Sequence, residues 1–313
     1  MLGLILRRIG STVIVMTVVA LFVFAMLHLA PGDPAAVIAG DIATQEDIAR
    51  IRSKLGLDRP LWEQFLVWLG HILTGDLGRS IFSDRPVVEL IGQRIEPTLA
   101  LATTTMLFSV IVAVPLGIFA AWRAGSWVDR LVMSFAVLGF SVPVFVFAYV
   151  LIIVFAVNLK WLPVMGYVSF RDDFGGFVRS IALPTLALGV TYIALIARIT
   201  RASMLEVIHQ DYIRTAHAKG LALGAVLFRH ALKPASVPIV TTIGIGVALL
   251  IGGVVVTESV FAIPGVGRLT VDAILRRDYP IIQGVILIFS GIYVLINLVI
   301  DIVYTLLDPR IRY

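Results

Sequence analysis

The chain has 313 residues, of which 59% are hydrophobic and only 14% are charged. Soluble domains carry about 25% charged residues, so this composition excludes an ordinary soluble protein and predicts a chain built mainly of membrane-spanning segments. The absence of cysteine excludes disulfide bonds and thiolate metal sites. The net charge of +5 is informative mainly through its distribution along the chain.

Six apolar runs are long enough to cross a bilayer, which takes about 20 helical residues. They are Ile9–Ala30, Thr98–Ala121, Leu131–Val157, Ile181–Ala197, Val237–Val256 and Ile281–Leu307. The runs are apolar on all sides rather than alternating, which favours helices over the strands of a barrel. The chain is therefore predicted to be an all-α membrane protein with six transmembrane helices. Pro115, Pro143 and Pro184 are expected to kink three of these helices.

Two of these runs carry arginine at one end. Arg7 and Arg8 precede the first run, as in a secretory signal, but no small-residue cleavage site follows. We therefore expect the first run to be retained as a helix. The fourth run is short and ends at Arg198, so its helix is expected to continue into the interface, where arginine can reach the headgroups.

The distribution of lysine and arginine predicts the orientation of the helices in the membrane. With the N-terminus inside, the cytoplasmic segments contain Arg7, Arg8, Arg123, Arg130, Arg198, Arg201, Arg214, Lys219, Arg229, Lys233, Arg310 and Arg312. The two shorter outer loops then contain only Lys160, Arg171, Arg179, Arg268, Arg276 and Arg277. Both termini are therefore predicted to be cytoplasmic.

The chain divides into an N-terminal helix (1–30), an extracytoplasmic insertion (31–97) and a transmembrane core (98–313). In the insertion, residues 44–55 place Ile48, Ile51 and Leu55 on one face at helical spacing, so we expect a small amphipathic helix there. Trp62 and Trp68 are typical of a lipid–water interface. The insertion either caps the bundle or forms a docking surface for an outer partner.

A basic cytoplasmic loop, residues 201–236, interrupts the apolar core. Asp211–Lys219 and Leu223–Leu232 each suit a short helix, and Gly220 lies where the first would end, a position that favours glycine. The second helix would have one buried face, formed by Leu223, Val226, Leu227, His230 and Ala231. The residues leave three interpretations open: a positive-inside anchor, a surface helix on anionic lipid, and a segment that transmits movement. A nucleic-acid site is not expected, because the loop has few aromatic residues.

No catalytic or metal-binding set of residues is recognisable. The sequence lacks the G-x-x-x-x-G-K-[ST] phosphate loop, so ATP is expected to be hydrolysed by a separate subunit. The histidines are scattered, without the spacing of a metal site: His28, His71, His209, His217 and His230. The chain is therefore not expected to be an enzyme, and neither a cofactor nor a metal is expected in it.

Ionisable groups at membrane depth are costly, so they are candidates for function by default. Glu258 lies at the outer end of the fifth run, and Asn297 and Asp301 lie four residues apart on one face of the last run. All three are candidates for lining a pathway or its gate. The alternatives are a cap for the loop after Glu258, and hydrogen bonds from the other two residues to a neighbouring helix.

Short sequence motifs spread along the whole chain are informative in combination. The cytoplasmic loop contains RTAHAKGL (214–221) and RHALKPASVPI (229–239). The other segments are APGDPA (30–35), LGLDRPLWEQF (55–65), GDLGRS (75–80), TLALA (98–102), WLPVMGY (161–167), FAIPGVGRL (261–269), RRDYPIIQG (276–284) and NLVIDIVYTLLDPRIRY (297–313). In this order they resemble the dipeptide and oligopeptide permeases of ABC importers. The resemblance implies a permease of the bacterial inner membrane that imports di- or oligopeptides.

The resemblance also implies partners and a coupling site. The partners would be a second homologous permease, two cytoplasmic ATPases that bind ATP and Mg, and an extracytoplasmic binding protein that delivers the peptide. The implied contact with an ATPase consists of Arg214, Thr215, Ala216, Lys219, Gly220 and Leu221, with Ala216 as the small packing residue and Gly220 as the turn. The usual loop has Glu-Ala-Ala where this chain has Arg214-Thr215-Ala216, so no specific acidic contact is implied.

Two alternatives to peptide import stay open. Similar permeases serve importers of glutathione and of nickel. An alternative of a different class is a channel or receptor subunit that works without an ATPase, in which the basic loop only anchors the chain to lipid.

Overall fold

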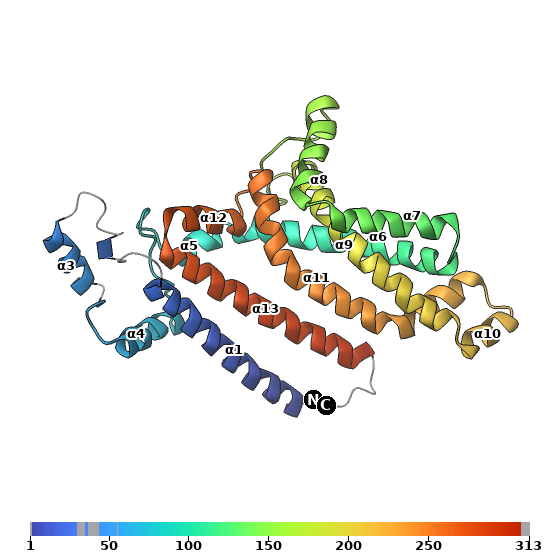
Figure 1. Cartoon of the computed structure of the whole chain (residues 1–313), viewed down its shortest axis with the longest axis horizontal. Coiled ribbons are helices and arrows are strands. Elements are labelled where there is room, and N and C mark those ends of the chain that lie inside the picture. Colours follow the sequence, from blue (N-terminus) through green and yellow to red (C-terminus); the bar gives the residue numbers. More distant parts are fainter. Residues whose placement is uncertain (1, 30–34, 37–43, 55, 308–313) are drawn as a thin grey trace. The chain divides into compact units, whose positions relative to one another are not determined.

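The computed structural model describes residues 2–29, 35–36, 44–54 and 56–307 (Figure 1). Within these residues the chain forms helices and no strands. The chain separates into two compact units, which are described in turn. The smaller unit contains residues 1–94 and 269–294, and the larger contains residues 95–268 and 295–313.

The larger unit is built around α9 (Phe174–Ile208), against which α6 (Ile95–Trp122), α7 (Trp127–Ser141) and α11 (Leu232–Val260) pack (Figure 1). In α9, 72% of the apolar stretch is buried, against 28–33% in the other long apolar helices. α9 is therefore the central helix of this unit. It also extends well past Ala197 and Arg198, which confirms the expected continuation of the fourth run.

Small residues allow the neighbouring helices to approach α9 closely. A Cβ on Gly117 of α6 would lie 2.7 Å from the carbonyl oxygen of Ala197 in α9. A Cβ on Gly139 of α7 would lie 3.0 Å from the Cβ of Ala194, also in α9. Membrane helices commonly pack through such small residues, because close backbone contact replaces the hydrophobic driving force. Larger side chains at either glycine would push α6 or α7 away from α9.

The predicted third span is not one helix, which corrects the sequence prediction. α7 ends at Ser141, and the chain then bends by 104° before α8 (Val144–Leu151) begins. α8 runs directly into the π-helical turn η1 (Ile152–Asn158). Val142, which precedes Pro143, is extended at φ −97° and ψ 125°. Proline disfavours the helical conformation in the residue before it and removes one backbone donor. The proline therefore breaks this helix rather than kinking it.

The second predicted loop helix also differs from expectation. η2 (Ala225–Ala231) is a π-helical turn that runs directly into α11, so this segment is the start of a long helix rather than a separate short one. Val226, Leu227 and Ala231 are buried, which confirms most of its predicted inner face. No positive-φ residue interrupts residues 225–237, and Pro234 falls in the first turn of α11, where proline is tolerated, so nothing local stops the helix.

The smaller unit contains the N-terminal helices together with the segment around residue 280. Its helices are α1 (Leu2–Leu29), α3 (Gln45–Lys54), α4 (Leu61–Leu73) and α5 (Val87–Gly92), with most of α12 (Val266–Arg276) and the first half of α13 (Tyr279–Leu307). α3 confirms the small helix expected at residues 44–55. Ala20, Val23 and Leu287 form a small buried cluster. The buried Gln283 donates to the carbonyl oxygen of Val23 at 3.0 Å, which ties α13 to α1.

A buried polar contact fixes the insertion within this unit. The Ser80 hydroxyl donates to a carboxylate oxygen of Asp278 at 2.5 Å, and the backbone N–H of Ile81 donates to the other oxygen at 3.2 Å. Ser80 and Asp278 are 4% and 3% exposed. The Asp278 carboxylate is thus hydrogen-bonded by residues 198 and 197 positions earlier in the sequence.

Among the described residues, four helices are long and apolar enough to cross a membrane, or five if α7 and α8–η1 are one bent span. α1 adds a shorter apolar stretch, Gly10–Met26. The chain is therefore a multi-helix membrane protein. The count of six spans and the cytoplasmic location of both termini stay predictions.

Candidate functional site

The helix α10 (Asp211–Ala218) occupies the predicted cytoplasmic loop and follows α9 after only His209 and Gln210. Its residues Ile213 and Ala216 are 1% and 7% exposed. They belong to an apolar cluster whose other buried members are Ile118, Ala121, Met204, Val226, Leu227, Ala231, Ala235 and Ile239. One apolar face of α10 is therefore buried in a cluster that it shares with α6, α9, η2 and α11.

The turn after α10 has the geometry predicted for Gly220. Its φ is +75°, and its N–H donates to the carbonyl oxygen of His217 at 2.9 Å. The N–H of Leu221 donates to the carbonyl oxygen of Ala216 at 3.4 Å. These two bonds form a Schellman motif, which places a left-handed residue directly after the helix. A Cβ on Gly220 would meet nothing within 4 Å, so the backbone conformation rather than packing requires glycine.

The remaining residues of the implied coupling site lie on the exposed side. Arg214 is 75% exposed along its side chain and makes only a loose pair, at 3.5 Å, with the exposed Asp211. Thr215, Lys219, Gly220 and Leu221 are also exposed. The structure thus gathers all six predicted residues on and just after one short helix. Their contact with an ATPase stays a prediction.

An ion pair near the end of α9 was not anticipated from the sequence. Asp129, at the start of α7, accepts two hydrogen bonds from the Arg201 guanidinium of α9, at 2.5 Å and 2.7 Å. The N–H of Gly125 donates to the same carboxylate at 2.9 Å. Asp129 is only 4% exposed. The turn between α6 and α7 is therefore tied to α9 seven residues before α9 ends at Ile208.

At the other end of α6, Glu258 is completely buried. Its carboxylate accepts from the Thr98 hydroxyl at 2.6 Å and from the N–H of Arg268 at 2.9 Å. Thr98 in turn accepts from the N–H of Val266 at 2.8 Å. A Cβ on Gly265 would collide with the Glu258 carboxylate. The side chain thus caps the loop that follows α11, as one of the two sequence alternatives expected, and its role in a pathway stays a prediction.

The same end of α6 holds a second loop, residues 159–173. Glu96 accepts from the Ser169 hydroxyl at 2.6 Å and from the Tyr167 hydroxyl at 3.2 Å. Burial and the neighbouring Glu96 carboxylate raise the pKa of Tyr167 to about 12, so this phenol stays a donor. The N–H of Gly166 donates to the carbonyl oxygen of Phe261 at 2.9 Å. We call the contacts of Glu96, Thr98 and Glu258 with loops 159–173 and 261–268 the outer junction.

The other two pathway candidates lie on the last helix. Asn297 is partly buried on α13. Asp301 belongs to the same helix by its backbone, but its side chain lies outside the described part of the structure. Their pathway role stays a prediction. Among the described residues, no group of three or more histidine, aspartate or glutamate side chains is arranged to hold a metal ion.

Comparison with known sequences covers both parts of the chain. Residues 113–313 match the family described as binding-protein-dependent transport system inner membrane component, and residues 1–102 match its N-terminal counterpart. A probable peptide ABC transporter permease of Sinorhizobium fredii is 56% identical over 99% of each chain. A putative peptide transport system permease of Brucella abortus is 46% identical, and the glutathione transport system permease GsiC of Salmonella typhimurium is 43% identical, both over the whole of each chain.

A solved structure shows the same fold. The inward-facing MetNI methionine ABC transporter superposes with a TM-score of 0.59 over 71% of this chain and 97% of that one, at 18% identity. A second crystal form of MetNI gives a TM-score of 0.55 over 70% of this chain. At such low identity the likeness establishes the fold alone.

Proposed function

The chain belongs to the family of binding-protein-dependent transport system inner membrane components, and from this premise we propose that it forms half of the translocation pathway of an ATP-driven peptide importer. A second, homologous permease would complete the pathway. Two cytoplasmic ATPases would bind ATP and Mg, and an extracytoplasmic binding protein would deliver the peptide. The names of the relatives favour peptides, a class that includes glutathione, as the substrate.

The observation that carries the proposal is the direct connection between α10 and the central helix α9. Only two residues separate them, and the buried face of α10 packs beside Met204 near the end of α9. At 35 residues and 1.5 Å per residue, α9 is about 52 Å long, which exceeds the roughly 30 Å hydrocarbon core. A displacement of α10 by a partner would therefore act on a helix that crosses the membrane.

The ion pair between Asp129 and Arg201 supports the same mechanism. It joins the α6–α7 turn to α9 close to α10, while Gly117 and Gly139 keep α6 and α7 in close contact with α9 farther along. Close-packed helices move together rather than deforming independently, because interiors have low compressibility. We propose that α6, α7 and α9 respond as one body when ATP-driven closure of the ATPases moves α10.

The exposed side of α10 offers the surface that a partner would contact. Arg214 and Lys219 are exposed cations with no tight internal partner among the described contacts, and Leu221 adds an apolar side chain 41% exposed. In the alternative of a lipid anchor, only the positive charges would matter. The two proposals therefore differ in their dependence on the shape of the Gly220 turn.

A substitution at Gly220 tests the coupling role. Gly220→Val places a β-branched residue at φ +75°, a conformation that costs on the order of 1–3 kcal/mol locally. We expect normal insertion and abundance, but weak co-purification with the ATPases and loss of substrate-stimulated ATP hydrolysis and peptide uptake. The matched control is Gly224→Val, because Gly224 lies in the same loop with an ordinary helical φ of −58°.

The result that contradicts the coupling role is wild-type ATPase association and wild-type uptake for Gly220→Val. A lipid anchor predicts that outcome, because Arg214, Lys219, Arg229 and Lys233 keep their charges. The proposed orientation has its own test, since reporters fused to either terminus should be cytoplasmic and a reporter after Asp47 should be outside.

A further inference from the structure

The helix α4 packs on α1 through only part of its apolar surface. Phe65 and Trp68 of α4 contact Phe24 of α1, with ring centroids 5.3 Å and 5.6 Å apart. Ile72, one turn further along α4, packs on the same small cluster. No residue of α4 is fully buried, so the helix lies on the surface of its unit.

A second apolar face of α4 is left uncovered by the described residues. Trp62, Leu66 and Leu73 are 67%, 57% and 78% exposed. Their spacing of four and seven residues places them in one row along the helix, beside the row that packs on Phe24. We call these three residues the outer stripe.

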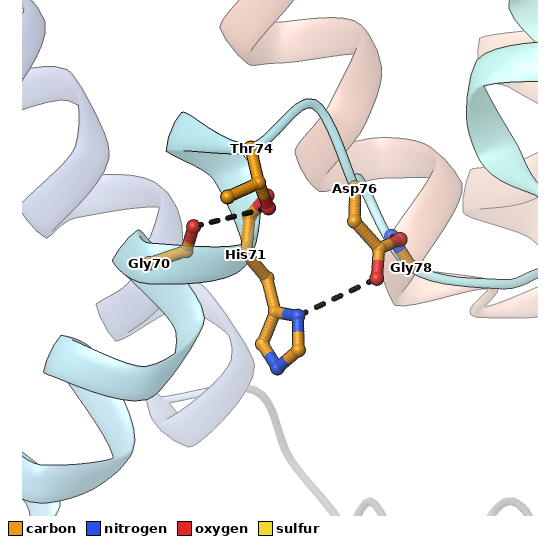
Figure 2. Close-up of polar contacts among 5 residues, drawn as sticks. All are labelled: Gly70, His71, Thr74, Asp76 and Gly78. Carbon is orange, nitrogen blue, oxygen red and sulfur yellow. Dashed lines mark hydrogen bonds and ion pairs between the residues drawn. The ribbon is translucent and has the colours of Figure 1, made fainter.

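The third side of α4 carries its polar groups together with the exposed Val67, and Figure 2 shows the polar contacts near the end of the helix. His71 lies 3.4 Å from Asp76, and the Thr74 hydroxyl donates to the carbonyl oxygen of His71 at 2.8 Å and of Gly70 at 3.3 Å. Near the start of the helix, Glu63 pairs with Arg59 at 3.0 Å. The helix thus has a water-compatible side and an apolar stripe at an angle to each other, as helices that lie in a membrane surface do.

The position of α4 along α1 indicates whether the outer stripe faces lipid or water. α1 exposes its own apolar row, Ile14, Val18 and Phe22, which are 67%, 60% and 65% exposed and suit the acyl chains of a bilayer. Phe24 lies five residues before the end of α1 at Leu29, which is about 8 Å along the helix. α4 is therefore attached at the level where the hydrocarbon core gives way to headgroups, and tryptophan is enriched at that level.

We propose that α4 lies in the headgroup region of the bilayer, with Trp62, Leu66 and Leu73 inserted among the phospholipid acyl chains. The attachment of α4 five residues before the end of α1, and the exposed apolar rows that both helices carry, favour lipid over a protein partner. The membrane surface thereby supports the insertion through α4, independently of peptide import or ATPase coupling.

Tryptophan fluorescence in proteoliposomes tests this placement. In the full-length chain within its assembled complex, Trp68, Trp122, Trp127 and Trp161 are replaced by phenylalanine, which leaves Trp62 as the sole tryptophan of this subunit. The subunit is exchanged into a complex whose other subunits also lack tryptophan. The control adds Trp62→Phe and Val67→Trp, because Val67 lies on the polar side of the same helix and is 48% exposed.

Phosphatidylcholine brominated near the headgroup should quench Trp62 at least about twice as strongly as the tryptophan of Val67→Trp, whereas aqueous iodide should show the reverse order. Strong iodide quenching of Trp62 with no effect of brominated lipid would overturn the proposal in favour of a solvent-exposed face. Protection of Trp62 from both quenchers would also overturn it, because a second copy or another protein would then cover the stripe.

Discussion

The outer junction at the start of α6 and the helix α10 near its end treat their charged residues in opposite ways. At its start, the outer junction buries the Glu258 carboxylate and satisfies it with Thr98 and the N–H of Arg268. Near its end, the α10 region is held by the apolar side chains of Ile213 and Ala216, while its charged residues remain exposed. The first arrangement satisfies its polar groups internally, whereas the charged groups of α10 are left exposed.

This difference predicts where substitutions act. A buried donor or acceptor that loses its partner costs its full desolvation energy. The loss of an exposed charged pair costs little, because water already solvates both groups. Substitutions in the outer junction should therefore reduce the stability of the chain itself. Substitutions on the exposed side of α10 should leave that stability unchanged and affect assembly.

Glu258→Ala should have the largest effect on stability. It leaves the Thr98 hydroxyl and the N–H of Arg268 without their buried acceptor, at a cost of about 2–4 kcal/mol. We expect a clear fall in the melting temperature of the purified protein. Glu206→Ala is the control, because Glu206 is exposed on α9. Equal melting temperatures for the two variants would contradict the role of Glu258 in the junction.

Gly265→Ala should come next. The added methyl group collides with the Glu258 carboxylate, and relief of such overpacking costs about 1–3 kcal/mol. Gly252→Ala in α11 adds the same methyl group where nothing lies within 4 Å, so it should leave the melting temperature unchanged or slightly raised. If Gly265→Ala were as stable as Gly252→Ala, the loop would not be packed tightly on the carboxylate.

Asp129→Asn should have an intermediate effect at the α10 end. It removes the charge that accepts two hydrogen bonds from Arg201, at about 1–3 kcal/mol. Asp211→Asn is the matched control, since Asp211 also begins a helix and pairs with an arginine, but its side chain is 97% exposed. Thermal unfolding of both variants would show whether burial, rather than charge pairing as such, determines the cost.

Arg214→Ala should have the smallest effect on stability. Its side chain is 75% exposed, and its pair with Asp211 is loose, so the melting temperature of the isolated subunit should not change. Under the proposed function, ATPase co-purification should nevertheless decrease. Arg229→Ala removes the same charge outside the implied contact and should retain the ATPases. A loss of stability in Arg214→Ala would place this residue in the internal structure instead.

Several features of the α10 region could be predicted because they are local. The glycine-terminated helix and the inner face formed by Leu223, Val226, Leu227, His230 and Ala231 follow from spacing and from the backbone preferences of single residues, whereas the small residue Ala216 was implied by the family resemblance. The structure confirms the turn, with φ +75° at Gly220, and buries Val226, Leu227 and Ala231 of the predicted face. The family resemblance then added a role that no local pattern contains.

The contacts that fix the ends of the larger unit could not be predicted in this way. Glu258 and Thr98 are 160 residues apart, and Asp129 and Arg201 are 72 apart. A polar residue shows no periodic signal for a distant partner. The acidic Asp129 in an otherwise basic turn was the only available hint of an internal pair.

By itself, the sequence determined the membrane character of the chain, the approximate positions of most of its long helices and the turn at Gly220. Each of these depends on apolar length or on the conformational limits of neighbouring residues. Tertiary structure alone decided that the third apolar run bends by 104° at Pro143, that η2 continues into α11, and that Glu258 lies in a loop junction. These outcomes depend on which distant groups can satisfy a buried polar atom or fill the space beside a helix, and only the packed chain brings those groups together.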